Sequence, residues 1–224
     1  MDWDNILDDK NSKLIYQILL GIILAILSFV IFAKLADTVF EKETILFDST
    51  FTNYIYTYRN PVTTKIMIYI TDFGSYGVAI LSLVFTIILF LKKYYKLSFY
   101  FAFIVGSGFV ANALLKLIVQ RQRPNFMPLV TETDFSFPSG HTMGAFIFFT
   151  TVVYFFYHLT RKKFITSILL VFAILITFVI GLSRIYLGVH YPSDILGGIV
   201  AGFLWVVGII TANKIYKLIK ISKN

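Results

Sequence analysis

The 224-residue sequence has no cysteine and few charged side chains. Without cysteine, the chain can form neither a disulfide framework nor a thiolate metal site. Charged residues make up 14% of the chain, whereas a soluble domain averages about 25%. Apolar residues make up 58% and fall in blocks long enough to cross a bilayer, which takes about 20 residues per helix. The composition excludes a soluble fold and predicts one membrane domain over residues 1–224.

Six apolar segments are predicted to cross the membrane as helices, because the strands of a barrel would alternate polar and apolar residues. The predicted fold class is therefore all-α, a six-helix transmembrane bundle. The first segment has an acidic flank at residues 2–9 and a longer apolar run than a signal peptide, so we expect a retained helix. The predicted spans are residues 14–33, 77–91, 97–119, 142–157, 164–183 and 195–215.

The longest connection between predicted spans covers residues 37–76. Its apolar run at residues 66–70 is too short to cross a bilayer. We expect interfacial, partly helical structure that lies on the outer leaflet. Its sequence is compatible both with an ordered loop that has no catalytic role and with a lid or guide for a lipid.

A net charge of +8 alone would suit a nucleic-acid partner. The basic residues instead gather at the ends of the apolar segments, as membrane topology requires, so no nucleic-acid partner is expected. Lys10 and Lys13 before the first span, and four tail lysines ending with Lys223, lie on the face with more basic residues. This bias predicts a multi-pass protein of the cell membrane with both termini in the cytoplasm.

Three short polar motifs lie at the ends of predicted spans, all on the face opposite the termini, which predicts a site facing outside. The last motif, S-R-x5-H-x3-D, contains Arg184, His190 and Asp194. His190 is a candidate nucleophile at phosphorus, and Asp194 can accept a hydrogen bond from its imidazole and stabilise the charge that grows on the ring. Alone, His190 would also fit a packed interfacial histidine. Beside a carboxylate and a guanidinium, a catalytic role is favoured.

The middle motif is Pro-Ser-Gly-His at residues 138–141, where a polar loop meets a span. Ser139 is predicted to be a helix N-cap, and Gly140 allows another backbone to approach closely. The free N–H groups of a helix N-terminus bind phosphate. His141 then lies where it can protonate a departing oxygen as general acid and later activate water.

The first motif, K-x6-R-P, contains Lys116 and Arg123 at the end of the third span. Charges near hydrocarbon are costly and usually functional. Arg123 and Arg184 can bind phosphate oxygens in a bidentate way, whereas Lys116 acts as a point charge. We interpret Arg121 as a charge at the helix end, outside the phosphate-binding group.

In chain order the three motifs are K-x6-R-P, Pro-Ser-Gly-His and S-R-x5-H-x3-D. Together they resemble the signature of the type 2 phosphatidic acid phosphatase superfamily, whose integral-membrane branch has six spans. The resemblance covers residues 116–194 by motif and the whole chain by the number of spans. It implies that His190 forms a phosphohistidine, that Asp194 orients it and that His141 is the acid. The phosphate-binding positions that it implies are Lys116, Arg123, Ser139, Gly140 and Arg184.

The resemblance also implies a metal-independent phosphatase that needs no cofactor and acts on a membrane lipid phosphate. Bacterial-type members of the family act on phosphatidylglycerophosphate, phosphatidate and undecaprenyl diphosphate. The residues agree with this reading, because the chain has only 12 acidic residues and those near the motifs lack metal-ligand spacing. The cationic cluster would supply the charge stabilisation directly.

Two other functions use the same residues. A phosphotransferase would pass the phosphoryl group from His190 to an acceptor other than water. An anion channel would use Lys116, Arg123 and Arg184 as a selectivity ring, but it leaves the spacing of His190 and Asp194 unexplained. A GxxxG pattern at residues 198–202 indicates close helix packing within the bundle, so we expect a monomer or a weak homodimer.

Overall fold

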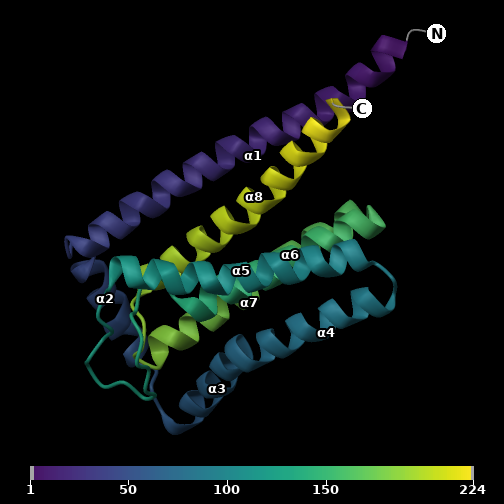
Figure 1. Ribbon diagram of the computed structural model, residues 1–224. Helices are drawn as coiled ribbons and strands as arrows, with labels where there is room; N and C mark the ends of the chain where they lie inside the picture. Colours follow the sequence, from purple (N-terminus) through teal and green to yellow (C-terminus); the bar gives the residue numbers. More distant parts are fainter. Residues whose placement is uncertain (1–2, 223–224) are drawn as a thin grey trace.

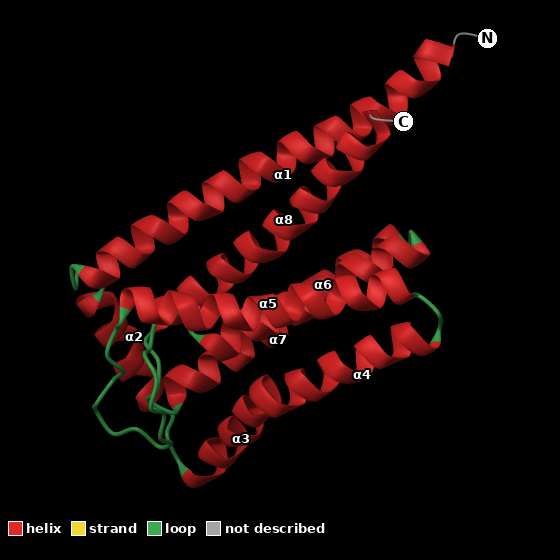
Figure 2. Ribbon diagram, in the orientation of Figure 1, coloured by secondary structure: helices red, strands yellow, loops and turns green. Residues whose placement is uncertain are grey.

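A computed structural model describes the backbone of residues 3–222 and the side chains of residues 12–222. This part of the chain is a helical bundle without β-strands, which confirms the predicted fold class (Figure 1, Figure 2). The side chains of the acidic flank at residues 2–9, of Lys10 and of Lys223 are not described. Their contribution to topology stays a prediction.

Six segments of the described chain are long and apolar enough to cross a membrane, as the sequence predicts. Each begins before its predicted start, and four of them also end after their predicted end. The helices are α1 (Trp3–Phe40), α2 (Ile45–Tyr56), α3 (Pro61–Asp72), α4 (Val78–Leu91), α5 (Tyr95–Val119), α6 (Gly140–Thr160), α7 (Lys163–Tyr186) and α8 (Pro192–Ser222).

The predicted start of the second span is wrong. Residues 61–76 were assigned to the interfacial connection, but α3, a π-helical turn at Phe73–Gly77 and α4 form one continuous segment, Pro61–Leu91. Residues 37–40 belong to α1. Of the predicted connection, only α2 and its flanking turns lie outside the spans.

The start of α3 is set by Asn60. Its Oδ1 accepts hydrogen bonds from the backbone N–H groups of Val62 and Thr63, each at 3.0 Å, and Pro61 is favourable as a first helical residue. The polar residues after the short apolar run do not end the helix, because it continues through a π-helical turn. Thr71, just before this turn, is buried and accepts a hydrogen bond from Arg184 of α7 at 2.7 Å.

The three motif segments lie at one end of the bundle. α5 ends there, α6 begins there, and α7 passes into α8 there, beside the short helix α2 (Figure 1). The N-terminal end of α1, the C-terminal end of α8 and the α4–α5 turn lie at the opposite end of the bundle (Figure 1). This arrangement is the antiparallel one that places all three motifs on one membrane face.

The helices that carry the site are held by close packing. α1 runs along α8, and at Gly21 an added Cβ would come within 2.2 Å of Thr211 Oγ1, so only glycine permits this approach (Figure 1). α6 is the most enclosed span and packs against α5, α7 and α8. Its Ala145 and Phe155 are fully buried. The first turn of α6 is therefore fixed relative to the three helices that surround it.

Candidate active site

Backbone hydrogen bonds of the α5–α6 connection bring the motifs together. The N–H of Ser139, just before α6, donates to the carbonyl of Asp194 in α8 at 3.0 Å. The N–H of Ser136 donates to the carbonyl of Arg121 at 2.8 Å. These bonds hold the connection between the end of α5 and the first turn of α8. The three motif segments thus lie together at this end of the bundle.

His190 and Asp194 form a buried pair, with 1% and 0% of their surface exposed. Nδ1 of His190 lies 3.2 Å from Oδ2 of Asp194, and Nε2 lies 3.1 Å from Nη1 of Arg123. A guanidinium can only donate, so Nε2 accepts and the proton of the neutral ring is on Nδ1. Nδ1–H then donates to Asp194. The electron pair on Nε2 is the one available for nucleophilic attack.

Burial lowers the pKa of His190 to about 4. The carboxylate of Asp194 favours the charged ring and so opposes this shift. Burial, together with the guanidinium groups of Arg123 and Arg184, outweighs it. The ring is therefore neutral at physiological pH, the form in which Nε2 is a nucleophile.

We expect the imidazole of His190 to stay neutral well below the ordinary histidine pKa of about 6.5. The chain has three histidines, so imidazole signals of ¹⁵N-labelled protein can be assigned with single His→Gln variants. The ¹⁵N shifts of His190 should remain those of the Nδ1–H tautomer until the pH approaches 4. A His190 signal that titrates like that of a free histidine would contradict this assignment.

Asp194 is held by more than the imidazole. Its Oδ2 also accepts hydrogen bonds from the hydroxyl of Ser136 and, at 2.8 Å, from the backbone N–H of Tyr191. Asp194 is the third residue of α8, so the bond to Tyr191 N–H is the part of a capping box in which the side chain reaches back. Asp194 therefore caps α8 and accepts a hydrogen bond from His190, while its role in orienting the nucleophile stays a prediction.

The three cations assigned to phosphate binding converge on two carboxylates of the α5–α6 connection. Lys116 and Arg123 both bind Asp134, and Arg184 binds Glu132. Nε of Arg184 is buried and has no hydrogen-bond partner among the described residues. An unsatisfied buried donor on a charged group is costly, and an anion that reached it would remove this cost. The cluster is therefore suited to binding phosphate oxygens.

Asp134 stays ionised. Burial raises its pKa, but hydrogen bonds and charges from Lys116 and Arg123 outweigh burial and lower the pKa to about 2. Its carboxylate thus occupies two of the cations that the motifs assign to phosphate. A phosphate group must compete with Asp134 for them.

Replacing Asp134 by asparagine is expected to tighten the binding of phosphate and of vanadate, its transition-state analogue, by up to about fivefold. The gain is small because the Asp134 side chain is 53% exposed, and exposed ion pairs contribute about 0–1 kcal/mol. Inhibition constants for vanadate measure it, with Thr133→Ala as the control in the same exposed loop. Weaker inhibition in Asp134→Asn would show that the carboxylate orients the cations instead of competing for them.

The start of α6 offers free backbone donors. Ser139 occupies the predicted N-cap position, but its hydroxyl accepts from Thr142 Oγ1 at 3.0 Å and caps no backbone N–H. The N–H groups of the first turn are thus left for an anion. At Gly140 an added Cβ would lie 2.9 Å from Oδ1 of Asn112, so glycine permits the close approach of α5. His141 follows in the same turn and is partly exposed.

Sequence analysis interpreted Arg121 as a charge at the helix end, outside the phosphate-binding group, and did not predict its contacts with two carboxylates. Its guanidinium lies 2.5 Å from Asp194 and 2.6 Å from Asp48 of α2. Asp48 was not singled out, and neither was Ser136. The K-x6-R-P spacing identifies Arg123 but not the arginine two residues before it. Asp48 lies in a connection without a recognisable pattern, so no signal in the sequence marked it.

Fold and site together define a class: an integral-membrane helical bundle with a histidine–carboxylate pair beside an anion-binding cluster. The model of the PAP2 superfamily matches residues 72–216, and the chain belongs to this superfamily. Phosphatidylglycerophosphatase B of Bacillus subtilis (strain 168) is 40% identical over 102 residues, which are 45% of this chain. The chain thus spans 50% of the length of that relative.

Other relatives agree with this assignment. Undecaprenyl-diphosphatase BcrC of Bacillus subtilis (strain 168) is 32% identical over 154 residues, 66% of this chain and 73% of that protein. The crystal structure of a transmembrane PAP2-type phosphatidylglycerolphosphate phosphatase from Bacillus subtilis matches with a TM-score of 0.78 at 29% identity. That match covers 84% of this chain and 95% of the other.

Proposed function

We propose that the protein is a metal-independent lipid phosphatase that works through a phosphohistidine on His190. The buried pair of His190 and Asp194 carries this proposal, because its hydrogen bonds place a proton on Nδ1 and leave Nε2 free to attack. Family membership supports the same chemistry. The cations around the site would stabilise the charge of the phosphoryl group, which is the part that metal ions take in other phosphatases.

The proposed reaction uses both histidines. Arg123 transfers its hydrogen bond from Nε2 of His190 to a phosphate oxygen, and Nε2 forms a bond to phosphorus while the bond from phosphorus to the leaving oxygen breaks. His141 gives its proton to that oxygen. His141, now neutral, then takes a proton from water as the water attacks phosphorus. The bond to Nε2 breaks, and inorganic phosphate leaves.

An apolar groove of about 450 Å³ supports a lipid substrate. Met143, one turn from Gly140, lines the groove, which therefore begins beside the first turn of α6. Phe29 of α1 and Leu114 of α5 also line it and are 59% and 55% exposed, so the groove opens towards the bilayer. The hydrocarbon tail of the substrate would lie here while its phosphate reaches the cations.

The charge bias supports placing the site outside the cell and both termini in the cytoplasm. Among the described residues, Lys13 lies at the start of the first span, Ser12–Phe40, and Lys214, Lys217 and Lys220 lie near the end of the last span, Pro192–Ser222. The substrate would then be a lipid phosphate of the outer leaflet. We propose a monomer or a weak homodimer, since the glycines at 198 and 202 pack against α6 within the chain.

The deciding experiment is phosphate release by purified protein in the presence of EDTA. Phosphatidylglycerophosphate, phosphatidate and undecaprenyl diphosphate are the substrates, and product analysis with added acceptor lipids separates hydrolysis from transfer. We expect free phosphate from at least one lipid without added metal. Anion flux through liposomes with no phosphate release from any of them would replace the proposal with a channel.

A substitution that narrows the groove tests whether the hydrocarbon tail of the substrate binds there. Leu114→Trp should lower kcat/KM for a long-chain lipid by about tenfold, because overpacking costs about 1–3 kcal/mol, and should spare a short-chain phosphate. Leu117→Trp is the matched control, since Leu117 is 59% exposed on the same helix and does not line the groove. Equal effects of the two variants on both substrates would place the tail elsewhere.

A further inference from the structure

A buried carboxylate outside the three motifs is linked to the catalytic pair. Asp48 of α2 is 1% exposed and lies outside the segment that the family model matches. Its Oδ1 accepts a hydrogen bond from the N–H of Ser193 at 2.9 Å, and its Oδ2 accepts one from the Ser193 hydroxyl at 2.7 Å. These two bonds fix Asp48 against the first turn of α8.

Arg121 connects Asp48 to Asp194. Nη2 of Arg121 donates to Oδ2 of Asp48 at 2.6 Å, and Nη1 donates to Oδ1 of Asp194 at 2.5 Å. The guanidinium also lies over the ring of Tyr191, 4.1 Å from its centroid. Burial alone would lower the pKa of Arg121, but Asp194 and Asp48 outweigh burial and raise it. The guanidinium therefore stays charged between two carboxylates.

We propose that Asp48 and Arg121 are positioning residues that hold Asp194 ionised and directed at His190. This inference rests on the proposed function, because it concerns the same reaction. Arg121 binds the oxygen of Asp194 that faces away from the imidazole, so it leaves Oδ2 to His190. Among the described residues, neither Asp48 nor Arg121 hydrogen-bonds to His190, so their effect on the reaction is transmitted through Asp194.

The charge balance explains why two carboxylates are needed. If Arg121 faced Asp194 alone, its charge would neutralise the carboxylate on which the imidazole depends. With Asp48 present, two carboxylates share one guanidinium, and a net negative charge remains beside His190. That charge stabilises the ring as it becomes cationic during attack on phosphorus.

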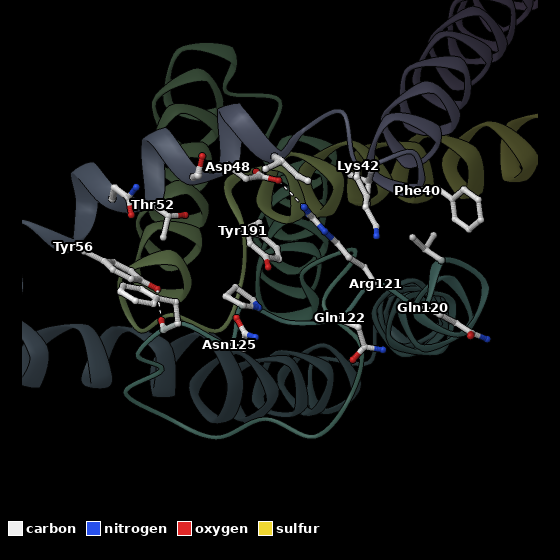
Figure 3. Close-up of a pocket in the computed structure, with 17 residues that line it drawn as sticks. Phe40, Lys42, Asp48, Thr52, Tyr56, Gln120, Arg121, Gln122, Asn125 and Tyr191 are labelled. Atoms are coloured by element: carbon white, nitrogen blue, oxygen red, sulfur yellow. Dashed lines mark hydrogen bonds and ion pairs between the residues drawn. The ribbon is translucent and has the colours of Figure 1, made fainter.

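A cavity lies beside the network formed by Asp48, Arg121 and Asp194, and it makes substitutions of Asp48 tolerable. It has a volume of about 770 Å³ and is bordered by Asp48, Arg121 and Tyr191, as Figure 3 shows. Neither His190 nor the cations assigned to phosphate, Lys116, Arg123 and Arg184, line it. Water in this cavity can solvate a group that loses its partner. We therefore expect variants of Asp48 to fold.

The first test is kinetic. Asp48→Asn should lower kcat about ten- to hundredfold with little change in KM, because a hydrogen bond to a charged group is lost without any change in the phosphate-binding cations. Ser49→Ala is the matched control: it is exposed on the same helix, and its hydroxyl bonds only to the Leu46 carbonyl at 3.2 Å. Wild-type kcat in folded Asp48→Asn would overturn the proposal.

The second test needs no turnover. It measures the pKa of His190 in each variant from imidazole ¹⁵N shifts. The charged groups that act on His190 are Asp194 of α8, Arg123 of the connection and Arg184 of α7, and none of them is changed in these variants. Arg121→Gln leaves two carboxylates without a countercharge and should raise the pKa of His190. Asp48→Asn removes a negative charge and should lower it.

The double variant Asp48→Asn/Arg121→Gln should bring the pKa of His190 between those of the two single variants. A packing role alone would reduce the amount of folded protein without opposite shifts, and this outcome would overturn the proposal. If the two single variants shift the pKa of His190 in opposite directions but the wild-type protein releases no phosphate, the positioning of Asp194 is supported and the proposed function is refuted.

Discussion

Replacing His190 by alanine is expected to lower phosphate release by at least about 10³-fold, because no other described group can take the place of a nucleophile in a two-step reaction. Nε2 of His190 carries no proton and is held beside the cations by its hydrogen bond from Arg123. Wild-type protein given ³²P-labelled substrate should also form an acid-labile, alkali-stable phosphoenzyme, and His190→Ala should not.

The control for this experiment is His158→Ala. His158 lies in the last turn of α6, at the other end of the helix that carries His141, and its ring stacks on Tyr154 at 6.2 Å. Its removal should leave turnover unchanged. Because His190 is buried, both variants are compared at equal amounts of folded, monodisperse protein. Turnover of His190→Ala within tenfold of wild type would show that the phosphoryl group is not transferred to this residue.

The number of spans and the convergence of the motifs could be predicted because both depend on local signals. A charge such as Lys116 at the end of an apolar helix is costly in a membrane unless it has a function, and the alternation of antiparallel spans then places all motif ends on one face. The pair of His190 and Asp194 is equally local, since four residues bring them together at the start of α8.

What could not be predicted depends on contacts between distant segments. The apolar run at residues 66–70 is too short to predict a span, but Thr71 beyond it is buried and accepts a hydrogen bond from Arg184 across the bundle. The role of Arg121 is visible only once Asp48, 73 residues earlier, is placed beside it. The occupation of the cations by Asp134 likewise depends on the path of the α5–α6 connection.

His141 should reveal its role through the leaving group. A lipid alkoxide needs a proton as it departs, whereas p-nitrophenolate leaves without one. His141→Gln is therefore expected to lower the rate of the first step about 10²–10⁴-fold for a lipid phosphate, the usual contribution of a general acid, and far less for p-nitrophenyl phosphate. Single-turnover kinetics with the two substrates measures this difference.

The second step depends on His141 as well, because the same side chain would then activate water. With p-nitrophenyl phosphate, His141→Gln should release about one equivalent of p-nitrophenol in a burst and then stall as the phosphohistidine at His190 accumulates. Ser139→Ala, next to the same helix start, serves as a comparison: loss of a phosphate contact should slow both substrates to a similar extent. If His141→Gln also slows both substrates equally and shows no burst, His141 binds phosphate and does not transfer the proton.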